Sequence, residues 1–516
     1  MKVHLLFISS SLLLGAILAS FQPGDFYIGW AIFSLLFLLS LYALRFMYRW
    51  TGGGRALAWM IAFAFLLRLA LGVALYLSLP LDGNPNEQNQ AGYIFFDSYR
   101  RDAQAWDLAQ SDQPILNAFS KNFYTDQYGG LLAFSALAYR YLSPGAHRPL
   151  LIVVFSALAA ALGVSFLWKA AARQWGGSVA APAAWIFALY PESILLGSAQ
   201  MREPFLMLFT AMALWGFVEW QNDGERRGWM WLASGLAGML LVSPGVALAM
   251  LVILGGWLWV RHEHGRVSWI ALAAAGLVFL AGLYLLAWGL TRESFGAGSP
   301  LGVIFEWFRG AVKWDVYQLE RGSGWVQKLF DEMPAALRPL FVTVYGITRP
   351  VLPAQFVEPT TLTLRLLGIF RSVGWYALVP LLFYAPFAVR RTQPGPERRL
   401  WAWLTASVWV WIVIASLRGG ADEWDNPRYR AILLVWQSLA AGYAWAWSRG
   451  RRDAWLGRWV ALEVVFVAVF TQWYLSRYYH IGGQLPFGWM VVLLLGAAAA
   501  ILLGGWWWDR RRARRA

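Results

Sequence analysis

The sequence predicts an all-α fold: a polytopic bundle of about 12–14 transmembrane helices, with external juxtamembrane helices in two large loops. Three observations support this prediction. Hydrophobic residues make up 59% of the 516 positions and charged residues only 14%, whereas a soluble domain has about 25% charged residues. Apolar runs long enough to cross about 30 Å of hydrocarbon recur along the chain. Basic residues cluster in the short segments between alternate runs.

Each apolar run is expected to form one span, and Ser243-Pro244-Gly245 separates the least secure pair. The first run follows Met1-Lys2 and ends near Ala19-Ser20, as a signal peptide does, but its length favours a retained helix. The expected spans lie near 3–21, 26–48, 57–80, 149–168, 178–198, 204–220, 228–242, 244–262, 268–290, 372–390, 400–417, 429–447, 457–475 and 486–507.

The distribution of basic residues predicts the orientation. If the amino terminus is cytoplasmic, every predicted cytoplasmic loop is basic, and the basic tail at 510–515 returns to the cytoplasm. We therefore expect an integral plasma (inner) membrane protein with both termini cytoplasmic and the inserts 81–148 and 291–371 external. Topology explains the net charge of +15 better than nucleic acid does, so no nucleic-acid partner is expected. The absence of cysteine excludes disulfides and thiol nucleophiles.

The segment 97–107 carries the strongest chemical signal, because it is acidic and aromatic between apolar spans. Tyr99, Ala103 and Trp106 recur at helical spacing, which predicts an amphipathic helix lying on the membrane. Asp97 has two ordinary explanations. It can be an N-cap residue, or it can pair with Arg101 one turn later.

This segment resembles the first external loop of the GT-C class of membrane glycosyltransferases, bacterial and dolichyl-phosphate-mannose-dependent enzymes among them. Members of that class often carry the pattern Asp-Glu-x-x-Tyr-x-x-x-Ala. Asp97 and Ala105 keep its spacing, while Ser98 and Arg101 replace the usual Glu and Tyr. Further stretches resemble later parts of the class in the same order: 124–134 with 139–142, 190–192 with 202–204, and 426–430.

The resemblance covers about residues 57–450 and implies the domain organisation. Residues 1–56 form two additional N-terminal transmembrane helices, 57–450 form the catalytic core, and 451–516 form C-terminal transmembrane helices with a basic cytoplasmic tail. It also implies the partners: a polyprenyl-phosphate sugar donor, a lipid, glycan or protein acceptor on the external face, and the surrounding membrane lipids.

Sugar transfer of this kind needs a general base and cations for the leaving phosphate. We expect Asp97 to be the base, with Asp102 in reserve and Asp126 as a third candidate. These carboxylates could also hold a divalent metal ion, although their spacing does not require one. Arginine suits phosphate recognition, but each candidate arginine could equally anchor a helix end. The predicted substrate-binding residues are Tyr99, Arg100, Asp126, Tyr128, Glu192, Arg202, Glu203, Arg428, Tyr429 and Arg430.

Two charges fall inside predicted spans, and both are expected to be structural. Arg68 is expected to pair with an acid on another helix, such as Glu463, and Glu192 lies close to the end of its span.

Two other functions remain open. A secondary transporter would use broken helices, but it would show internal repeats, and none is visible. A ligase or polymerase of lipid-linked polysaccharide would use the basic insert 291–371.

Overall fold

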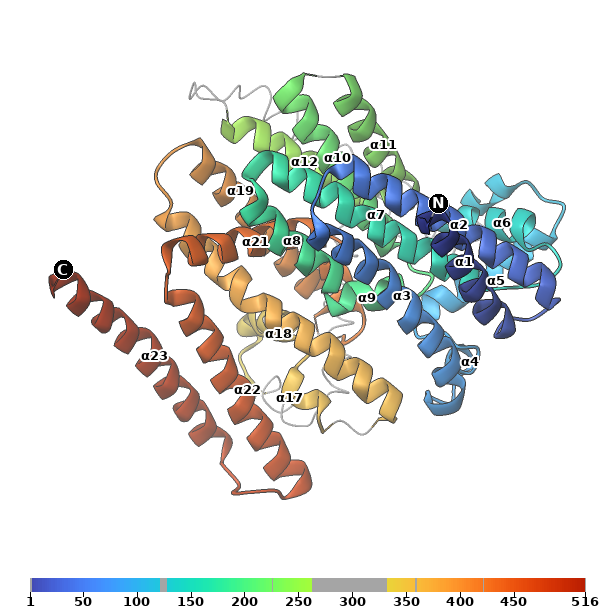
Figure 1. Cartoon of the computed structure of the whole chain (residues 1–516). Helices are drawn as coiled ribbons and strands as arrows, with labels where there is room; N and C mark the ends of the chain where they lie inside the picture. Colours follow the sequence, from blue (N-terminus) through green and yellow to red (C-terminus); the bar gives the residue numbers. More distant parts are fainter. Residues whose placement is uncertain are drawn as a thin grey trace, which may run out of the picture. The chain divides into compact units, whose positions relative to one another are not determined.

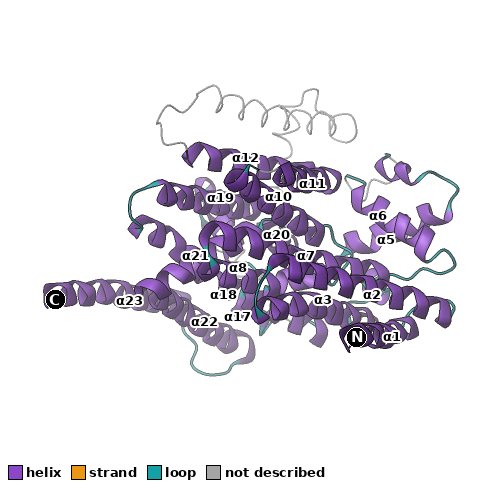
Figure 2. Cartoon of the chain, turned by 45° about the horizontal axis from the view of Figure 1, so that its top comes forward, coloured by secondary structure: helices purple, strands orange, loops and turns teal. Residues whose placement is uncertain are grey.

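The computed structural model describes residues 2–120, 128–224, 226–261, 332–357, 360–420 and 422–515. Every regular element in these ranges is a helix, and Figure 2 contains no strand among them. The all-α prediction is confirmed.

The chain divides into two compact units, which are described separately. Unit 1 comprises Met1–Leu251 with Ala431–Ser438, and unit 2 comprises Val252–Arg430 with Leu439–Ala516. The described part of unit 1 begins with twelve α-helices, which Figure 1 labels, and one 3₁₀ helix, η1. In chain order they are α1 (Lys2–Ser20), α2 (Phe26–Thr51), α3 (Arg55–Asp82), α4 (Glu87–Gln90), α5 (Phe96–Gln110), η1 (Ile115–Phe119), α6 (Gly130–Leu142), α7 (Leu150–Trp175), α8 (Gly177–Leu189), α9 (Pro191–Gly197), α10 (Glu203–Asp223), α11 (Arg226–Val242) and α12 (Pro244–Arg261), the last of which continues into unit 2.

The later helices fall mainly in unit 2. Helices α22 and α23 run side by side as a hairpin. The elements are η3 (Ala335–Leu337), α16 (Arg338–Thr348), α17 (Leu352–Gln355), α18 (Leu362–Arg391), α19 (Pro396–Gly419), α20 (Asp425–Ala431), α21 (Leu434–Arg451), α22 (Trp455–Tyr479) and α23 (Phe487–Arg515).

In the described part of the chain, nine helices are long and apolar enough to cross a membrane: α1, α2, α3, α7, α12, α18, α19, α22 and α23. The bent pair α8 and α9 makes a tenth if it counts as one span. The chain is therefore a multi-pass membrane protein. The expected spans at 204–220 and 228–242 are helical as α10 and α11, and a turn at 432–433 divides the one at 429–447 between α20 and α21. These helices are shorter or more polar than the nine. The span expected at 268–290 lies outside the described residues.

One predicted boundary is wrong. Helix α18 begins at Leu362, whereas the sequence placed the start of this span near 372. Arg365 and Arg371 interrupt the apolar run without interrupting the helix. The first ten residues of this helix therefore belong to the stretch that the sequence assigned to the second external insert.

A buried arginine organises the break between α8 and α9. Pro191 begins α9, and the two helices meet at an angle of 52°. Because proline has no N–H, the last carbonyls of α8 need other donors. Arg68 of α3 is fully buried and donates to the carbonyls of Phe187 at 3.4 Å and Ala188 at 3.1 Å. It also donates to Ser193 Oγ of α9 at 2.7 Å.

These contacts correct the expected partner of Arg68. Its remaining hydrogen bond goes to the carbonyl of Ala64 in its own helix at 2.8 Å. Within the described ranges its donors therefore reach carbonyl and hydroxyl oxygens, and no carboxylate. Gly197 allows this approach, since a Cβ there would lie 2.5 Å from Arg68 Cδ.

Replacing Arg68 with Met should destabilise the protein by about 2–5 kcal/mol, because each buried carbonyl left without a donor costs about 1–3 kcal/mol. Equilibrium unfolding of the purified protein in mixed micelles would measure the change. Arg55→Met is the matched control, since Arg55 is exposed at the first position of the same helix. Equal effects of the two substitutions would contradict this role of Arg68.

Candidate functional site

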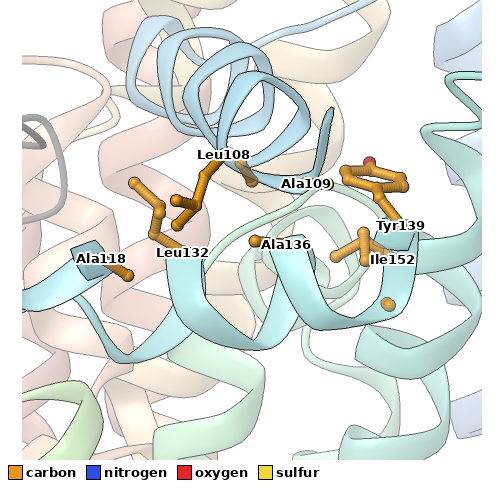
Figure 3. Close-up of a cluster of buried hydrophobic side chains, with 9 residues drawn as sticks. Leu108, Ala109, Ala118, Leu132, Ala136, Tyr139 and Ile152 are labelled. Carbon is orange, nitrogen blue, oxygen red and sulfur yellow. The ribbon is translucent and has the colours of Figure 1, made fainter. Parts of the chain in front are cut away.

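Helix α5 rests on a compact apolar cluster in unit 1. Figure 3 shows Leu108 and Ala109 of α5 directed toward Leu132 and Ala136 of α6, with Ile152 of α7 beside them. All five side chains are buried. Small residues on both helices let the backbones approach closely. This packing fixes α5 as a rigid support for the polar side chains along it.

A buried carboxylate ties α5 to its surroundings. Asp102 is fully buried, and both of its oxygens accept hydrogen bonds. The hydroxyls of Tyr93 and Tyr139 each donate to it, and Nε2 of His147 lies 2.7 Å from Oδ2. A buried carboxylate is stable only when it is compensated in this way. Asp102 thus joins α5 to α6, to the segment before α5 and to the loop before α7.

Aromatic packing holds the donors in place. The ring of His147 stacks on that of Trp106, with centroids 5.0 Å apart, and meets the Tyr139 ring edge-on at 5.1 Å. Sequence reasoning did not select Tyr93 or His147, because each lies outside the 97–107 segment. Their only signal is that they are aromatic and polar residues in otherwise apolar surroundings near a membrane surface.

The two tyrosines remain protonated donors. Burial, and secondarily the negative charge of Asp102, raises the pKa of Tyr139 well above its ordinary value. The same two causes, in the same order, raise the pKa of Tyr93. Each phenol therefore keeps its proton for the carboxylate at physiological pH.

A second buried contact joins α5 to the connection between α9 and α10. Arg101 is 2% exposed and donates to the carbonyl of Gln200 at 3.0 Å. The Gln200 side chain donates in turn to the Tyr139 hydroxyl and to the carbonyl of Pro149, both at 3.2 Å. The first turns of α5 are therefore fixed to the chain just before Arg202.

The carboxyl end of α5 is closed by an arginine from α6. Arg140 donates to the carbonyls of Leu108, Ala109, Ser111 and Gln113, at distances between 2.5 and 3.2 Å. The last carbonyls of a helix have no partner within it, and a cation there also suits the helix dipole.

Asp97 lies in the first turn of α5 and is half-buried. Phe95 is the N-cap residue, so the N-cap explanation of Asp97 is wrong. Asp97 precedes Arg101 by four residues, which places the two on one face of the helix. Tyr99 packs edge-on against Tyr93 with centroids 5.5 Å apart. Arg100 is exposed and lies 4.5 Å from the ring centroid of Phe96.

Arg202 precedes α10 as its N-cap residue. Its side chain is only 11% exposed, and its Nε lies 3.9 Å from Oε1 of the fully buried Glu203. The guanidinium carbon lies 5.6 Å from the ring centroid of Tyr128. Arg202 donates no hydrogen bond to any residue in the described ranges, and its Nε is buried. Glu192 is buried in the first turn of α9, and Asp126 lies outside the described residues.

The other predicted arginines belong to unit 2. Arg430 is fully buried and donates to the carbonyls of Gly346, Ile347 and Arg349. Its guanidinium carbon lies 3.8 Å from the ring centroid of Trp375. These contacts anchor α20 to the end of α16.

Arg428 and Tyr429 face the same acid. Nη1 of Arg428 lies 3.5 Å from Asp425 Oδ1, and the Tyr429 hydroxyl lies 3.4 Å from its other oxygen. Arg428 is nearly buried, at 5% exposed. The Arg418 guanidinium carbon lies 4.7 Å from the Tyr429 ring centroid.

A small cavity of about 30 Å³ lies beside the Asp102 network, enough for about one water molecule. Tyr76, Tyr93, Ser98, Ser198 and Gln200 supply its polar lining.

No group of three or more potential metal ligands occurs in the part of the chain that the structure describes. The donors that surround Asp102 already occupy both of its oxygens. Asp102 therefore does not fit the role of a ligand for the metal ion that the sequence allowed.

Comparison with known proteins gives one structural similarity. No family model matches the chain, and no curated protein matches it. The chain is similar to a solved structure of the archaeal oligosaccharyltransferase AglB from Archaeoglobus fulgidus, in complex with an inhibitory peptide and a dolichol-phosphate, with a TM-score of 0.35 and 15% identity. The match covers 85% of this chain and 54% of that chain.

Alkaline pH should destabilise the protein through Tyr93 and Tyr139. Their pKa values are raised on folding, so above about pH 10 the unfolded chain loses these protons before the folded chain does. Stability is therefore fully retained below that pH and falls as pH rises toward the folded pKa. Tyr139→Phe should lower stability at pH 7 by about 1–3 kcal/mol and should flatten its fall between pH 9 and 11.

The measurement is the midpoint of thermal unfolding as a function of pH. The control is Tyr141→Phe, which changes a residue of α6 that is 70% exposed and should leave the pH profile of the wild type unaltered. A Tyr139→Phe profile parallel to that of the wild type would contradict the assignment.

Proposed function

We propose that this protein is a membrane glycosyltransferase that moves a sugar from a polyprenyl-phosphate donor to a lipid, glycan or protein acceptor on the external face of the plasma membrane. One observation carries the proposal. Asp97 and Arg101 share a face of the rigid helix α5, and Arg101 fixes that face to the segment leading to Arg202. A carboxylate and a nearly buried arginine thus belong to one anchored piece of structure at the end of membrane helices.

The proposed reaction assigns Asp97 as general base. Its carboxylate takes the proton of an acceptor hydroxyl while the hydroxyl oxygen attacks the anomeric carbon. The bond from that carbon to the phosphate oxygen breaks, and polyprenyl phosphate leaves with the electron pair. Attack from the side opposite the leaving group inverts the anomeric centre. Half-burial of Asp97 suits this role, because a base must reach substrate.

Asp102 has a different role in the proposal. Its oxygens are occupied by Tyr93, Tyr139 and His147, so it is a positioning residue that holds α5, and with it Asp97.

Arg202 is the proposed phosphate-binding residue of unit 1. An arginine that donates no hydrogen bond within the described ranges, and is largely withdrawn from water, gains most when a phosphate arrives. The dipole of α10, which begins next to it, adds to the attraction. The Tyr128 ring supports the guanidinium from one side.

Among the unit 2 residues, too, one has a structural role and two are proposed to contact substrate. Arg430 supports the fold around α16 and α20, since backbone carbonyls occupy its guanidinium. Arg428 and Tyr429, which share Asp425, are proposed to contact donor or acceptor.

Asp97→Asn should lower sugar transfer by about 10²–10⁴-fold while the protein remains folded, because the substitution removes the proton acceptor and keeps the size of the side chain. The assay uses purified protein in liposomes, radiolabelled polyprenyl-phosphate sugars and mixed membrane acceptors. Asp107→Asn is the control, since Asp107 is exposed on the same helix. Full activity of the Asp97→Asn variant would exclude Asp97 as the general base. If the wild type moves the label across the membrane without transferring the sugar, the protein is a transporter and the proposed enzyme function is wrong.

Arg202→Gln should raise KM for the donor by about tenfold or more, because a charge-assisted contact to phosphate is lost. Arg202→Lys should raise KM less, since lysine keeps the charge of arginine but not its bidentate geometry. Arg227→Gln serves as control, because Arg227 is exposed at the start of α11. An unchanged KM in Arg202→Gln would remove the residue from the donor site.

A further inference from the structure

A second polar cleft lies at the other end of helix α7. Helix α7 begins at Leu150, close to His147, and ends at Trp175. Its 26 residues rise about 40 Å, which matches a bilayer with its headgroups. The cleft has a volume of about 320 Å³ and is lined by Thr51, Lys169, Ala172, Arg173, Trp215, Glu219 and Asp223.

The charged lining forms two opposed rows. Lys169 and Arg173 lie four residues apart near the end of α7, and Glu219 and Asp223 lie four residues apart near the end of α10. Each pair therefore lies on one face of its helix. Two cations face two acids, so the charged lining of the cleft has no net charge, and Ala172 and Trp215 form its apolar part.

Tryptophans place the cleft at a membrane surface. Nζ of Lys169 lies 3.7 Å from the ring centroid of Trp50 and 4.9 Å from that of Trp215. The rings of Trp50 and Trp231 are also adjacent, with centroids 5.8 Å apart. Tryptophans gather where hydrocarbon meets headgroups. Membrane helices α2 and α7 both end here.

The cations have donors to spare. Lys169 donates to the carbonyl of Trp50 at 2.8 Å, and one Nη of Arg173 donates to Asp223. The other guanidinium nitrogens of Arg173 bond to no residue in the described ranges. Its side chain is half-exposed toward the cleft. A phosphate there would find two cationic donors.

We propose that this cleft binds the headgroup of a phospholipid with a primary ammonium, as in phosphatidylethanolamine. The phosphate would contact Arg173 and Lys169, and the ammonium would donate to Glu219 and Asp223. The headgroup of an anionic lipid such as phosphatidylglycerol carries no cationic group that could pair with Glu219 and Asp223. A trimethylammonium group has no N–H for the carboxylates, and Lys169 already covers the Trp50 and Trp215 rings that would attract it.

The lipid source follows from the position of the cleft. Its lining comes from α2, α7 and α10, and α2 and α7 are apolar enough to cross a membrane. A headgroup in the cleft therefore keeps its acyl chains in the bilayer beside these helices. A soluble zwitterion would lack that anchorage.

Native mass spectrometry of the full chain tests the proposal. The detergent-purified protein is mixed with equimolar phosphatidylethanolamine, phosphatidylcholine and phosphatidylglycerol carrying the same acyl chains. We expect phosphatidylethanolamine to be retained about tenfold over the other two. Arg173→Gln and Glu219→Gln should each bring retention close to parity. Arg226→Gln, an exposed charge change at the start of α11, should leave the preference intact.

Other results would overturn the proposal. Equal retention of the three lipids would exclude headgroup selection, and preference for phosphatidylglycerol would make the cleft an anionic-lipid site. A preference that survives both substitutions would place the lipid elsewhere. Displacement by soluble phosphoethanolamine at the lipid concentration would assign the cleft to a free zwitterion. If Glu219→Gln loses its monodisperse elution, Asp223→Asn replaces it, because Asp223 is exposed at the helix end.

Discussion

The hydrogen bonds to the Asp102 carboxylate set the position of everything else in the candidate site. Three side chains from three different segments donate to this one fully buried group. Removing any of them would leave charge in an apolar environment, where the cost is severe. Helix α5 therefore has one permitted position on α6, and Arg101 and Arg140 fix its two ends in the same register. A general base on α5 is therefore held in a defined position, as catalysis requires.

The sequence predicted the fold class well, because hydropathy and basic loops report directly on a bilayer. It also located α5, whose apolar spacing and acidic character stand out from the surrounding spans. It did less well at the ends of helices. Arg365 and Arg371 broke the apolar pattern of α18 but not its backbone, because a long helix can carry arginines where a protein or a headgroup meets them.

The division of roles among the acids was beyond the sequence. Asp97 and Asp102 differ by five positions on one helix, and their patterns in the chain are alike. Only Asp102 accepts hydrogen bonds from Tyr93, Tyr139 and His147 in the structure described, and His147 is 45 residues away from it in the sequence. The same holds for the arginines. Arg202 and Arg430 both lie next to apolar helices. Only the folded chain shows that Arg430 donates to three carbonyls, whereas Arg202 donates to none in the part of the chain that the structure describes.

Arg68 carries a consequence for how the chain enters the membrane. Its tertiary partners, the carbonyls of Phe187 and Ala188, follow it by 119 and 120 residues. When α3 leaves the ribosome, none of them has been synthesised, and the guanidinium has only the Ala64 carbonyl of its own helix. A lone arginine at mid-bilayer is costly. The apolar residues of α3 must therefore offset this cost until α8 and α9 emerge. The order of synthesis thus makes the hydrogen bonds at the break between α8 and α9 a late step that completes the burial of an arginine in a much earlier helix.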